Sequence, residues 1–252
     1  MNIPKSNNPV AFITGASVRI GEAIAMRLHT GGYNVILHYR NSKVKAEALA
    51  AKFNAQRADS AMLVSGHLNE INAVMAMIAE VTNSKNLFDG RLDVLVNNAS
   101  LFYPTPIADA TMAQWDELVN TNLRAPFLLA QGLTEQLKST NGCIVNITDI
   151  YGNRPFANHP IYSMTKAGLI SLTKSLAADL APEIRTNGIS PGAILWPKQE
   201  EQDVAYHDKV LAEVPLKRLG KVEDISDTVW YLVNNDYVNG QIIAIDGGKS
   251  IN

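Results

Sequence analysis

The sequence predicts an α/β fold in which one parallel sheet of about seven strands is covered by helices on both faces. Short apolar runs alternate along the chain with longer segments that carry apolar residues at helical spacing. The runs are continuously apolar, which is typical of strands buried on both faces of a parallel sheet. A chain of 252 residues that is 46% hydrophobic can bury one large core, so we expect a single domain over residues 1–252.

The predicted strands are the short apolar runs, at residues 10–14, 33–39, 61–65, 92–96, 144–147, 186–190 and 241–245. The predicted helices lie between them, at residues 20–28, 43–53, 71–81, 112–137 and 161–180. Pro182 helps to end the last of these helices, and the run at 186–190 is the weakest strand. Gly192 to Val210 is one long irregular segment, and such a loop in a compact domain is usually a lid or a binding loop. We therefore expect a substrate-binding loop at about residues 192–215.

The composition argues against several classes of function. The formal net charge of −2 leaves no basic excess to neutralise nucleic-acid phosphates. The five histidines are scattered and show no spacing typical of a zinc site, so no metal is expected. Cys143 is the one cysteine and cannot form an internal disulfide, which favours a reducing compartment such as the cytoplasm. The N-terminal residues lack the apolar segment of a signal peptide, and no apolar run is long enough to span a membrane.

A glycine-containing loop follows the first predicted strand and opens the first predicted helix. Its sequence is Thr14-Gly-Ala-Ser-Val-Arg-Ile-Gly21. Glycine permits a tight turn and a close approach of the backbone to a pyrophosphate, while the helix N-terminus offers free N–H groups. Gly15, Ile20 and Gly21 are therefore predicted to bind a dinucleotide, with Arg19 in place of a third glycine. The alternative is a turn that needs glycine for its shape alone.

The end of the second predicted strand indicates which dinucleotide is bound. Folds of this kind that prefer NAD carry an acid there, which binds the ribose 2′-hydroxyl. Here the segment is His38-Tyr39-Arg40-Asn41-Ser42, which contains no acid. Arg40 suits a 2′-phosphate and Ser42 can add a hydrogen bond, so we predict NADPH as the cofactor. The alternative is that Arg40 is an ordinary solvated surface residue.

Tyr162 and Lys166 are four residues apart, which places them on one face of a predicted helix. An ammonium beside a phenol favours the phenolate, so we expect Lys166 to lower the pKa of Tyr162 from its ordinary value near ~10. A tyrosine tuned in this way can transfer protons in a reaction. Asp149 precedes Tyr162, at the end of the fifth predicted strand. Asp149 is a second candidate for proton transfer, and the alternative is that it only caps the end of the strand.

Several motifs recur together in one known family. They are the glycine loop, Asn97-Asn98-Ala99 after the fourth strand, Asn122 in the long helix, Tyr162 with Lys166, and Pro191-Gly192 after the sixth strand. With these motifs the chain resembles the short-chain dehydrogenases/reductases over nearly its whole length. The resemblance implies a single Rossmann-type doubly wound parallel sheet and a homotetramer. It also implies that Asn122 kinks the long helix and supports a water relay to the lysine, where the alternative is a plain helix residue.

Within that family the chain is most similar to the pteridine reductases. Arg19 replaces the middle glycine of the usual loop, residues 38–42 resemble their NADPH segment, and residues 98–106 match their substrate loop. Asp149 stands where most of the wider family has serine. The chain departs from the family at His67-Leu68-Asn69, where an acid commonly contacts adenine, and residues 193–197 are only loosely similar.

The resemblance implies hydride transfer from NADPH to a C=N bond of an oxidised or dihydro pterin, such as dihydrobiopterin, dihydromonapterin or dihydrofolate. Phe102 is expected to stack on the flat pterin opposite the nicotinamide. The expected catalytic residues are Asp149, Tyr162, Lys166 and Asn122. The expected cofactor-binding residues are Gly15, Arg19, Ile20, Gly21, His38, Tyr39, Arg40, Asn41, Ser42, Leu68, Asn98, Ala99, Ser100, Tyr162, Lys166, Pro191 and Gly192. The expected substrate-binding residues are Arg19, Ser100, Phe102, Asp149, Tyr162, Leu195 and Trp196.

Asp149 favours pterin reduction over two other functions. Reduction of a ring C=N bond needs a proton on nitrogen, which a carboxyl–tyrosine pair could relay, whereas an ionised carboxylate only accepts hydrogen bonds and orients the tyrosine. A carbonyl or 3-oxoacyl reductase of the same family is the first alternative, and serine at position 149 would have favoured it. A non-catalytic NADP(H)-binding sensor is the second, which the presence of Tyr162 and Lys166 disfavours.

Overall fold

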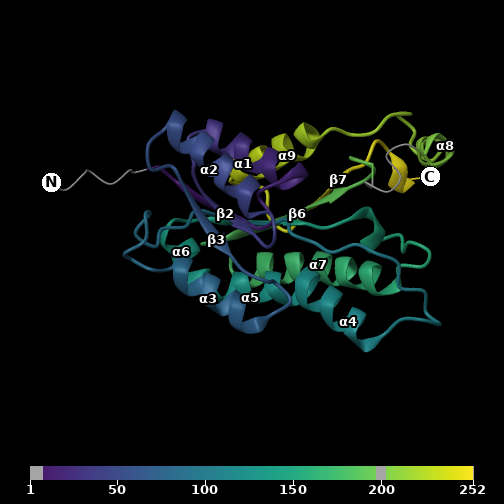
Figure 1. Ribbon diagram of the computed structural model, residues 1–252, viewed down its shortest axis with the longest axis horizontal. Helices are drawn as coiled ribbons and strands as arrows, with labels where there is room; N and C mark the ends of the chain where they lie inside the picture. Colours follow the sequence, from purple (N-terminus) through teal and green to yellow (C-terminus); the bar gives the residue numbers. More distant parts are fainter. Residues whose placement is uncertain (1–7, 197–202, 252) are drawn as a thin grey trace.

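A sheet lies at the centre of the molecule, between two layers of helices (Figure 1). It consists of seven parallel strands in the order β3-β2-β1-β4-β5-β6-β7. The computed structural model describes residues 8–196 and 203–251. The strands are β1 (Val10–Ile13), β2 (Asn34–Tyr39), β3 (Ala61–Ser65), β4 (Val94–Asn97), β5 (Cys143–Ile147), β6 (Arg185–Pro191) and β7 (Ile242–Ile245). The predicted fold class, a parallel sheet between two layers of helices, is confirmed.

The helices alternate with the strands along the chain. They are α1 (Arg19–Thr30), α2 (Lys43–Gln56), α3 (Ile71–Val81), α4 (Met112–Val119), α5 (Ala125–Gly132), α6 (Thr134–Ser139), α7 (Pro160–Asp179), α8 (Val204–Ala212) and α9 (Val222–Asn234). Short helical turns add Asn120–Arg124, Ile150–Gly152 and Lys249–Ile251. Within the described residues, no helix is both long enough and apolar enough to cross a membrane.

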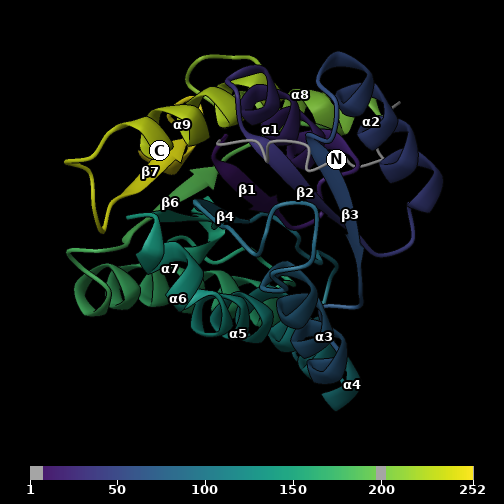
Figure 2. The ribbon, with the colours of Figure 1, turned by 90° about the vertical axis from the view of Figure 1, so that its left-hand side faces the viewer.

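Each face of the sheet carries its own hydrophobic core. Helices α1, α2 and α9 cover one face, and α3, α5 and α7 cover the other (Figures 1 and 2). In β1, Ala11 and Ile13 face the first core, whereas Val10 and Phe12 face the second. Successive side chains of a strand point to opposite faces, so a strand that is buried on both faces needs an apolar residue at every position. This requirement explains the continuous apolar runs of the sequence.

The strand order reverses at β1, which pairs with β2 on one side and with β4 on the other. Ligands of open parallel sheets bind at such a point, beyond the carboxyl ends of the strands. The loop after β1 begins at Thr14 and the segment after β4 begins at Asn98, so these two segments meet there. The sheet topology therefore places the glycine loop beside residues 98–106, the segment that resembles the substrate loop of the pteridine reductases.

The predicted helix over residues 112–137 is interrupted in the structure. It consists of α4, a π-helical turn at Asn120–Arg124, α5, and the short α6 after a change of backbone direction at Leu133. The π turn contains Asn122, whose amide hydrogen-bonds Leu101 on a neighbouring segment. The apolar periodicity alone predicted one continuous helix, whereas the expectation from the family resemblance that Asn122 kinks it agrees with the π turn.

Two other predictions about elements were incomplete. The irregular segment after Gly192 contains α8, and the sequence interpretation missed α9, although Ile225, Val229 and Leu232 recur at helical spacing and are buried. The strand predicted to be weakest is the seven-residue β6, which pairs with β5 and β7. Its polar Asn187 is accommodated because the side-chain amide donates to the carbonyl of Val238 and accepts from the N–H of Gln241.

Candidate active site

The glycine loop after β1 requires glycine at two positions. Gly15 has a φ of +64°, in the left-handed region that glycine adopts readily. A Cβ atom on Gly21 would lie 2.1 Å from the carbonyl oxygen of Gly15, which no side chain tolerates. The Asn98 side chain donates to the carbonyls of Thr14 (2.8 Å) and Gly15 (3.2 Å), which ties the loop to the end of β4. The loop is thus held close against the sheet, with its outer side open to a ligand.

His38 at the end of β2 supports this loop through its ring. Nδ1 accepts a hydrogen bond from the N–H of Gly15 (3.0 Å), and Nε2 lies 3.1 Å from the carbonyl of Gly66. The carbonyl can only accept, so the proton is on Nε2 and the ring is neutral. Burial lowers the pKa of His38 to about 4, consistent with this state. Both ring nitrogens therefore bind the backbone of the protein, although the sequence predicts that His38 contacts the cofactor.

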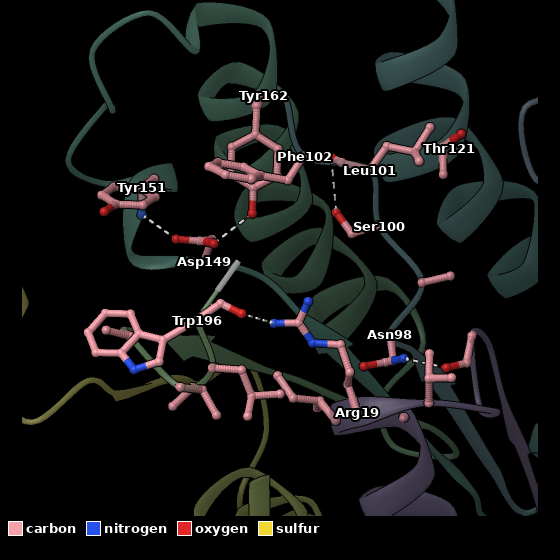
Figure 3. Close-up of a pocket in the computed structure, with 18 of the residues that line it drawn as sticks. Arg19, Asn98, Ser100, Leu101, Phe102, Thr121, Asp149, Tyr151, Tyr162 and Trp196 are labelled. Atoms are coloured by element: carbon pink, nitrogen blue, oxygen red, sulfur yellow. Dashed lines mark hydrogen bonds between the residues drawn. The ribbon is translucent and has the colours of Figure 1, made fainter. Parts of the chain in front are cut away.

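The N-terminus of α1 lies open at the bottom of the site. Val18 at the N-cap provides no side-chain hydrogen bond to the first turn, and Val18, Ile20 and Gly21 line the cavity, so N–H groups of this turn can serve a ligand. Arg19 follows with a φ of +55°, the conformation of the glycine that it replaces. Its guanidinium donates to the carbonyl of Trp196 (3.4 Å) and so reaches across the cavity to the segment after β6 (Figure 3).

Arg40 and Ser42 lie at the far end of the same cavity, beyond the end of β2. Arg40 is exposed, and Ser42 hydrogen-bonds Ser17 of the glycine loop (Oγ to Oγ, 3.0 Å). Among the described residues that line the cavity, the carboxylates are Asp149 and Glu213, which belong to other segments than Arg40 and Ser42. The positive charge of Arg40 therefore suits an anionic group on the ligand, because a guanidinium binds phosphate oxygens with two donors in a fixed geometry.

The Tyr162 hydroxyl donates a hydrogen bond of 2.6 Å to Oδ2 of Asp149 (Figure 3). Oδ1 of the same carboxylate accepts from the N–H of Tyr151 at 2.9 Å. Burial raises the pKa of Asp149, against the hydrogen bonds that lower it. Burial also raises the pKa of Tyr162 well above its usual value, and the charge of Asp149 raises it further. The two groups thus form a buried acid pair joined by one proton.

Lys166 lies one helical turn beyond Tyr162, with its ammonium fully buried. Its Nζ donates to the carbonyl of Ile147 (3.0 Å) and lies 5.7 Å from the centre of the Tyr162 ring. Burial lowers the pKa of Lys166 to about 8. The expected lowering of the Tyr162 pKa by Lys166 is not found, because desolvation and Asp149 both favour the protonated phenol.

Phe102 forms an aromatic plate above this pair (Figure 3). His159 stacks on one side of the ring at 4.6 Å and 7°, and Tyr162 meets it edge-on at 4.8 Å. The Phe102 side chain is still 48% exposed, so a ring surface remains open to the cavity. A flat aromatic ligand can stack there within reach of the Tyr162 hydroxyl.

Asn122 does not line the cavity, but it holds the segment that carries Phe102 in place. Its side chain accepts from the N–H of Leu101 (2.8 Å) and from Ser100 Oγ (3.1 Å). It also donates to the carbonyl of Leu101 (2.9 Å) and to Thr165 Oγ1 on α7 (3.3 Å). Asn122 therefore fixes the segment that carries Ser100 and Phe102 to the helix that carries Tyr162.

One cavity of about 700 Å³ brings nearly all predicted site residues together. Three of them do not line it: Asn122, Lys166 and Pro191, which are buried behind its wall. The predicted residues that line it are Gly15, Arg19, Ile20, Gly21, His38, Tyr39, Arg40, Asn41, Ser42, Leu68, Asn98, Ala99, Ser100, Phe102, Asp149, Tyr162, Gly192, Leu195 and Trp196. The part of the predicted substrate loop at residues 197–202 lies outside the described residues.

The sequence interpretation missed a second group of residues that line the cavity. Tyr151 and Phe156 come from the segment between β5 and α7, and they stack on each other at 4.4 Å. Glu213 follows α8, and Lys249 lies near the end of the described chain. Tyr151 could have been found as the residue two places after Asp149, but no local pattern connects positions 213 and 249 to the site.

The fold and the cavity together define the class of protein. A glycine loop at the switch point of a parallel sheet is the arrangement that binds a dinucleotide, and the clash at Gly21 and the open α1 N-terminus fit a pyrophosphate. The same cavity holds the hydrogen-bonded pair of Tyr162 and Asp149. These features are typical of Rossmann-type oxidoreductases.

The chain belongs to the short-chain dehydrogenase/reductase family, because the family model described as enoyl-(acyl carrier protein) reductase matches residues 15–250. The 3-oxoacyl-(acyl-carrier-protein) reductase FabG of Staphylococcus aureus is 36% identical, over 94% of this chain and 96% of its own. Pteridine reductase 1 of Leishmania tarentolae is 34% identical, over 96% of each chain. Members of this family use NAD(P)H, bind small-molecule substrates and are commonly oligomeric.

Proposed function

We propose that the protein is an NADPH-dependent pteridine reductase that reduces a C=N bond of oxidised or dihydro pterins to give tetrahydropterins. The observation that carries the proposal is the 2.6 Å hydrogen bond between Tyr162 and the half-buried carboxyl of Asp149, next to the exposed ring of Phe102. A flat heterocycle on that face would lie beside a proton-donating pair. Gly192, Leu195 and Trp196, which line the cavity, support a substrate-binding loop at about residues 192–215.

The proposed chemistry adds a hydride to the carbon and a proton to the nitrogen of the C=N bond. NADPH, when bound, supplies the hydride. In the reacting arrangement a protonated Asp149 would donate from Oδ2 to the Tyr162 oxygen, the reverse of the direction seen for the ionised carboxylate, and Tyr162 would turn its own proton toward the ring nitrogen. As Tyr162 gives up that proton, the Asp149 proton passes to the Tyr162 oxygen and leaves an Asp149 carboxylate. The raised pKa of Asp149 favours a carboxyl that carries a proton. Lys166 would hold the cofactor's ribose hydroxyls by turning its Nζ from the Ile147 carbonyl toward the cavity, and Arg19 would contact the cofactor's phosphates.

Reduction of a carbonyl or 3-oxoacyl group is the second candidate, and the similarity to FabG from Staphylococcus aureus favours it. The product of carbonyl reduction is an alkoxide, which a neutral donor such as serine stabilises and a carboxylate does not. An ionised Asp149 beside Tyr162 would oppose that negative charge, whereas a protonated Asp149 could serve either reaction. The open ring face of Phe102, which suits a flat heterocycle, therefore leads us to rank pterin reduction first.

A steady-state assay separates the two functions. Purified protein with NADPH is expected to turn over dihydrobiopterin, dihydromonapterin or dihydrofolate with a kcat/KM at least about tenfold above that for an acetoacetyl thioester. Absence of turnover with every pterin, together with reduction of the thioester, would establish the carbonyl reductase instead. NADPH binding without oxidation by either class of substrate would favour a sensor.

Arg40 and Ser42 support NADPH over NADH as the cofactor. Arg40→Asp removes the cation at the proposed 2′-phosphate site and adds a carboxylate that suits a ribose 2′-hydroxyl. The ratio of kcat/KM for NADPH over NADH is expected to fall by roughly a hundredfold, because a charged hydrogen bond is lost and a repulsion is added. Equal ratios in wild type and variant would remove this assignment. The homotetramer and the cytoplasmic location stay predictions.

A further inference from the structure

A buried lysine from the C-terminal end of the described chain lies at one end of the cavity. The Lys249 side chain is 10% exposed, and its Nζ lies 3.2 Å from Oε2 of Glu213, which follows α8. The same ammonium lies 5.8 Å from the centre of the Tyr151 ring. All three residues line the cavity that contains Tyr162 and Asp149. The proposed chemistry of hydride and proton transfer gives Lys249 and Glu213 no role.

A wall of stacked rings leads from the aromatic plate to this ion pair. Phe102 stacks on His159, His159 packs on Phe156 at 4.7 Å, and Phe156 stacks on Tyr151 at 4.4 Å. Tyr151 lies next to Asp149, on the side away from Asn98 (Figure 3). A substituent on a ring held between Phe102 and Asp149 can therefore run along this wall toward Tyr151 and Lys249.

Space for a substituent continues behind the ion pair. A second cavity of about 350 Å³ is lined by Ile150, Tyr151, Arg154, Pro155, Glu213 and Lys249. Tyr151, Glu213 and Lys249 line both cavities, so they form the boundary between the two. The end of the substrate site is therefore a polar boundary with adjacent donor and acceptor groups.

The chemistry of this boundary suits hydroxyl groups. An ammonium only donates hydrogen bonds and a carboxylate only accepts them, whereas a hydroxyl does both. Neighbouring hydroxyls can therefore satisfy both ions of the pair at once. A carboxylate tail would meet the negative charge of Glu213, and an alkyl group would leave the buried Lys249 without a polar ligand contact.

We propose that Lys249 and Glu213 are specificity-determining residues that bind a short, hydroxylated side chain on the substrate ring. This inference rests on the proposed pterin reduction and names the substrates within it. They are dihydropterins with a hydroxylated alkyl side chain, rather than those with a methyl group or with an aminobenzoyl-glutamate tail.

The test compares two dihydropterins that differ only in the side chain, one with a trihydroxypropyl group and one with a methyl group. Lys249→Met and Glu213→Gln are each expected to lower the ratio of kcat/KM, hydroxylated over methyl, by roughly tenfold. The change should appear mainly as a higher KM for the hydroxylated substrate, because these contacts bind substrate and transition state alike. Glu183→Gln, at an exposed position outside the cavity, is the matched control and should leave the ratio unchanged.

The outcomes separate this inference from the proposed function. A wild-type enzyme that reduces neither dihydropterin contradicts both. A wild-type enzyme that reduces both, with a ratio that neither variant changes, contradicts only the role of Lys249 and Glu213. Should Lys249→Met fail to fold, Glu213→Gln decides the question, because its side chain is 56% exposed and the change keeps its size.

Discussion

At the scale of single residues, the Tyr162 hydroxyl is the proposed proton donor. Tyr162→Phe removes that hydroxyl and keeps the ring that contacts Phe102. We expect kcat with a dihydropterin to fall by about a hundredfold or more, the usual contribution of a positioned acid. Tyr237→Phe, at a side chain that is 98% exposed, is the control. A change within about threefold, which is under ~1 kcal/mol in the barrier, would show that Tyr162 is not the donor.

Asp149 separates proton relay from simple orientation of Tyr162. Burial raises its pKa, so the protonated form persists to a higher pH than for an ordinary carboxyl. If this form relays the proton, kcat falls as the pH rises through the raised pKa. Asp149→Asn still accepts the Tyr162 hydrogen bond but has no proton to relay, so we expect kcat to fall roughly tenfold or more and this pH dependence to disappear. Identical pH–rate profiles for wild type and variant would leave Asp149 only an orienting role.

Some roles of single residues could be predicted from the sequence and others could not. Spacing along one helix was enough to bring Tyr162 and Lys166 together, because a helix fixes the relation of residues four apart. The direction of the Tyr162 pKa was not predictable, since it depends on burial and on Asp149 from another element. The sequence placed His38 at the cofactor, and it lines the cavity, but its hydrogen bonds to Gly15 and Gly66 were not predictable because they join distant segments.

At the scale of elements, Arg19 combines a side-chain role with a backbone cost at the start of α1. Its φ of +55° is unfavourable for any residue with a Cβ atom. Arg19→Gly and Arg19→Ala both remove the guanidinium, but only glycine relieves the backbone. We expect both variants to raise the KM for NADPH, and the glycine variant to be more stable than the alanine variant by about 1 kcal/mol. Urea unfolding measures this difference, and equal stabilities would mean that the loop relaxes in the alanine variant.

The elements themselves were predictable to the extent that each has a local pattern. Strands such as β1 and β4 appeared as continuous apolar runs. The interruption of the long helix was expected only from the family resemblance at Asn122, because apolar spacing does not show the hydrogen bonds that Asn122 makes to Leu101 on a distant segment. β6 appeared weak because Asn187 is polar, and only its partners Val238 and Gln241 explain why it is buried.

At the scale of the whole molecule, the parallel sheet follows from the strict alternation of strands and helices. Apolar residues at successive positions of each strand demand a helical layer on both faces, and the two cores satisfy that demand. The candidate site then follows from topology, because the carboxyl ends of β1, β4 and β5 meet at one edge. The contributions of Glu213 and Lys249 do not follow, because they arise where the end of the chain folds back on the segment after α8.

Two buried histidines couple the stability of the whole molecule to acid. Burial lowers the pKa of His29 and of His38 to about 4, from 6.5. As the pH falls from 6.5 toward 4, the two histidines take up protons in the unfolded chain but not in the folded protein. The free energy of unfolding therefore decreases over this range, by up to about 1.4 kcal/mol per pH unit for each histidine. His29→Gln can keep the hydrogen bond to Ser60 but cannot titrate. Urea unfolding at several pH values is expected to show a smaller acid-induced loss of stability for this variant than for wild type. His67→Gln, at an exposed histidine, serves as the control and should show the same acid-induced loss of stability as wild type. An equal loss of stability in all three proteins would mean that His29 does not contribute to it.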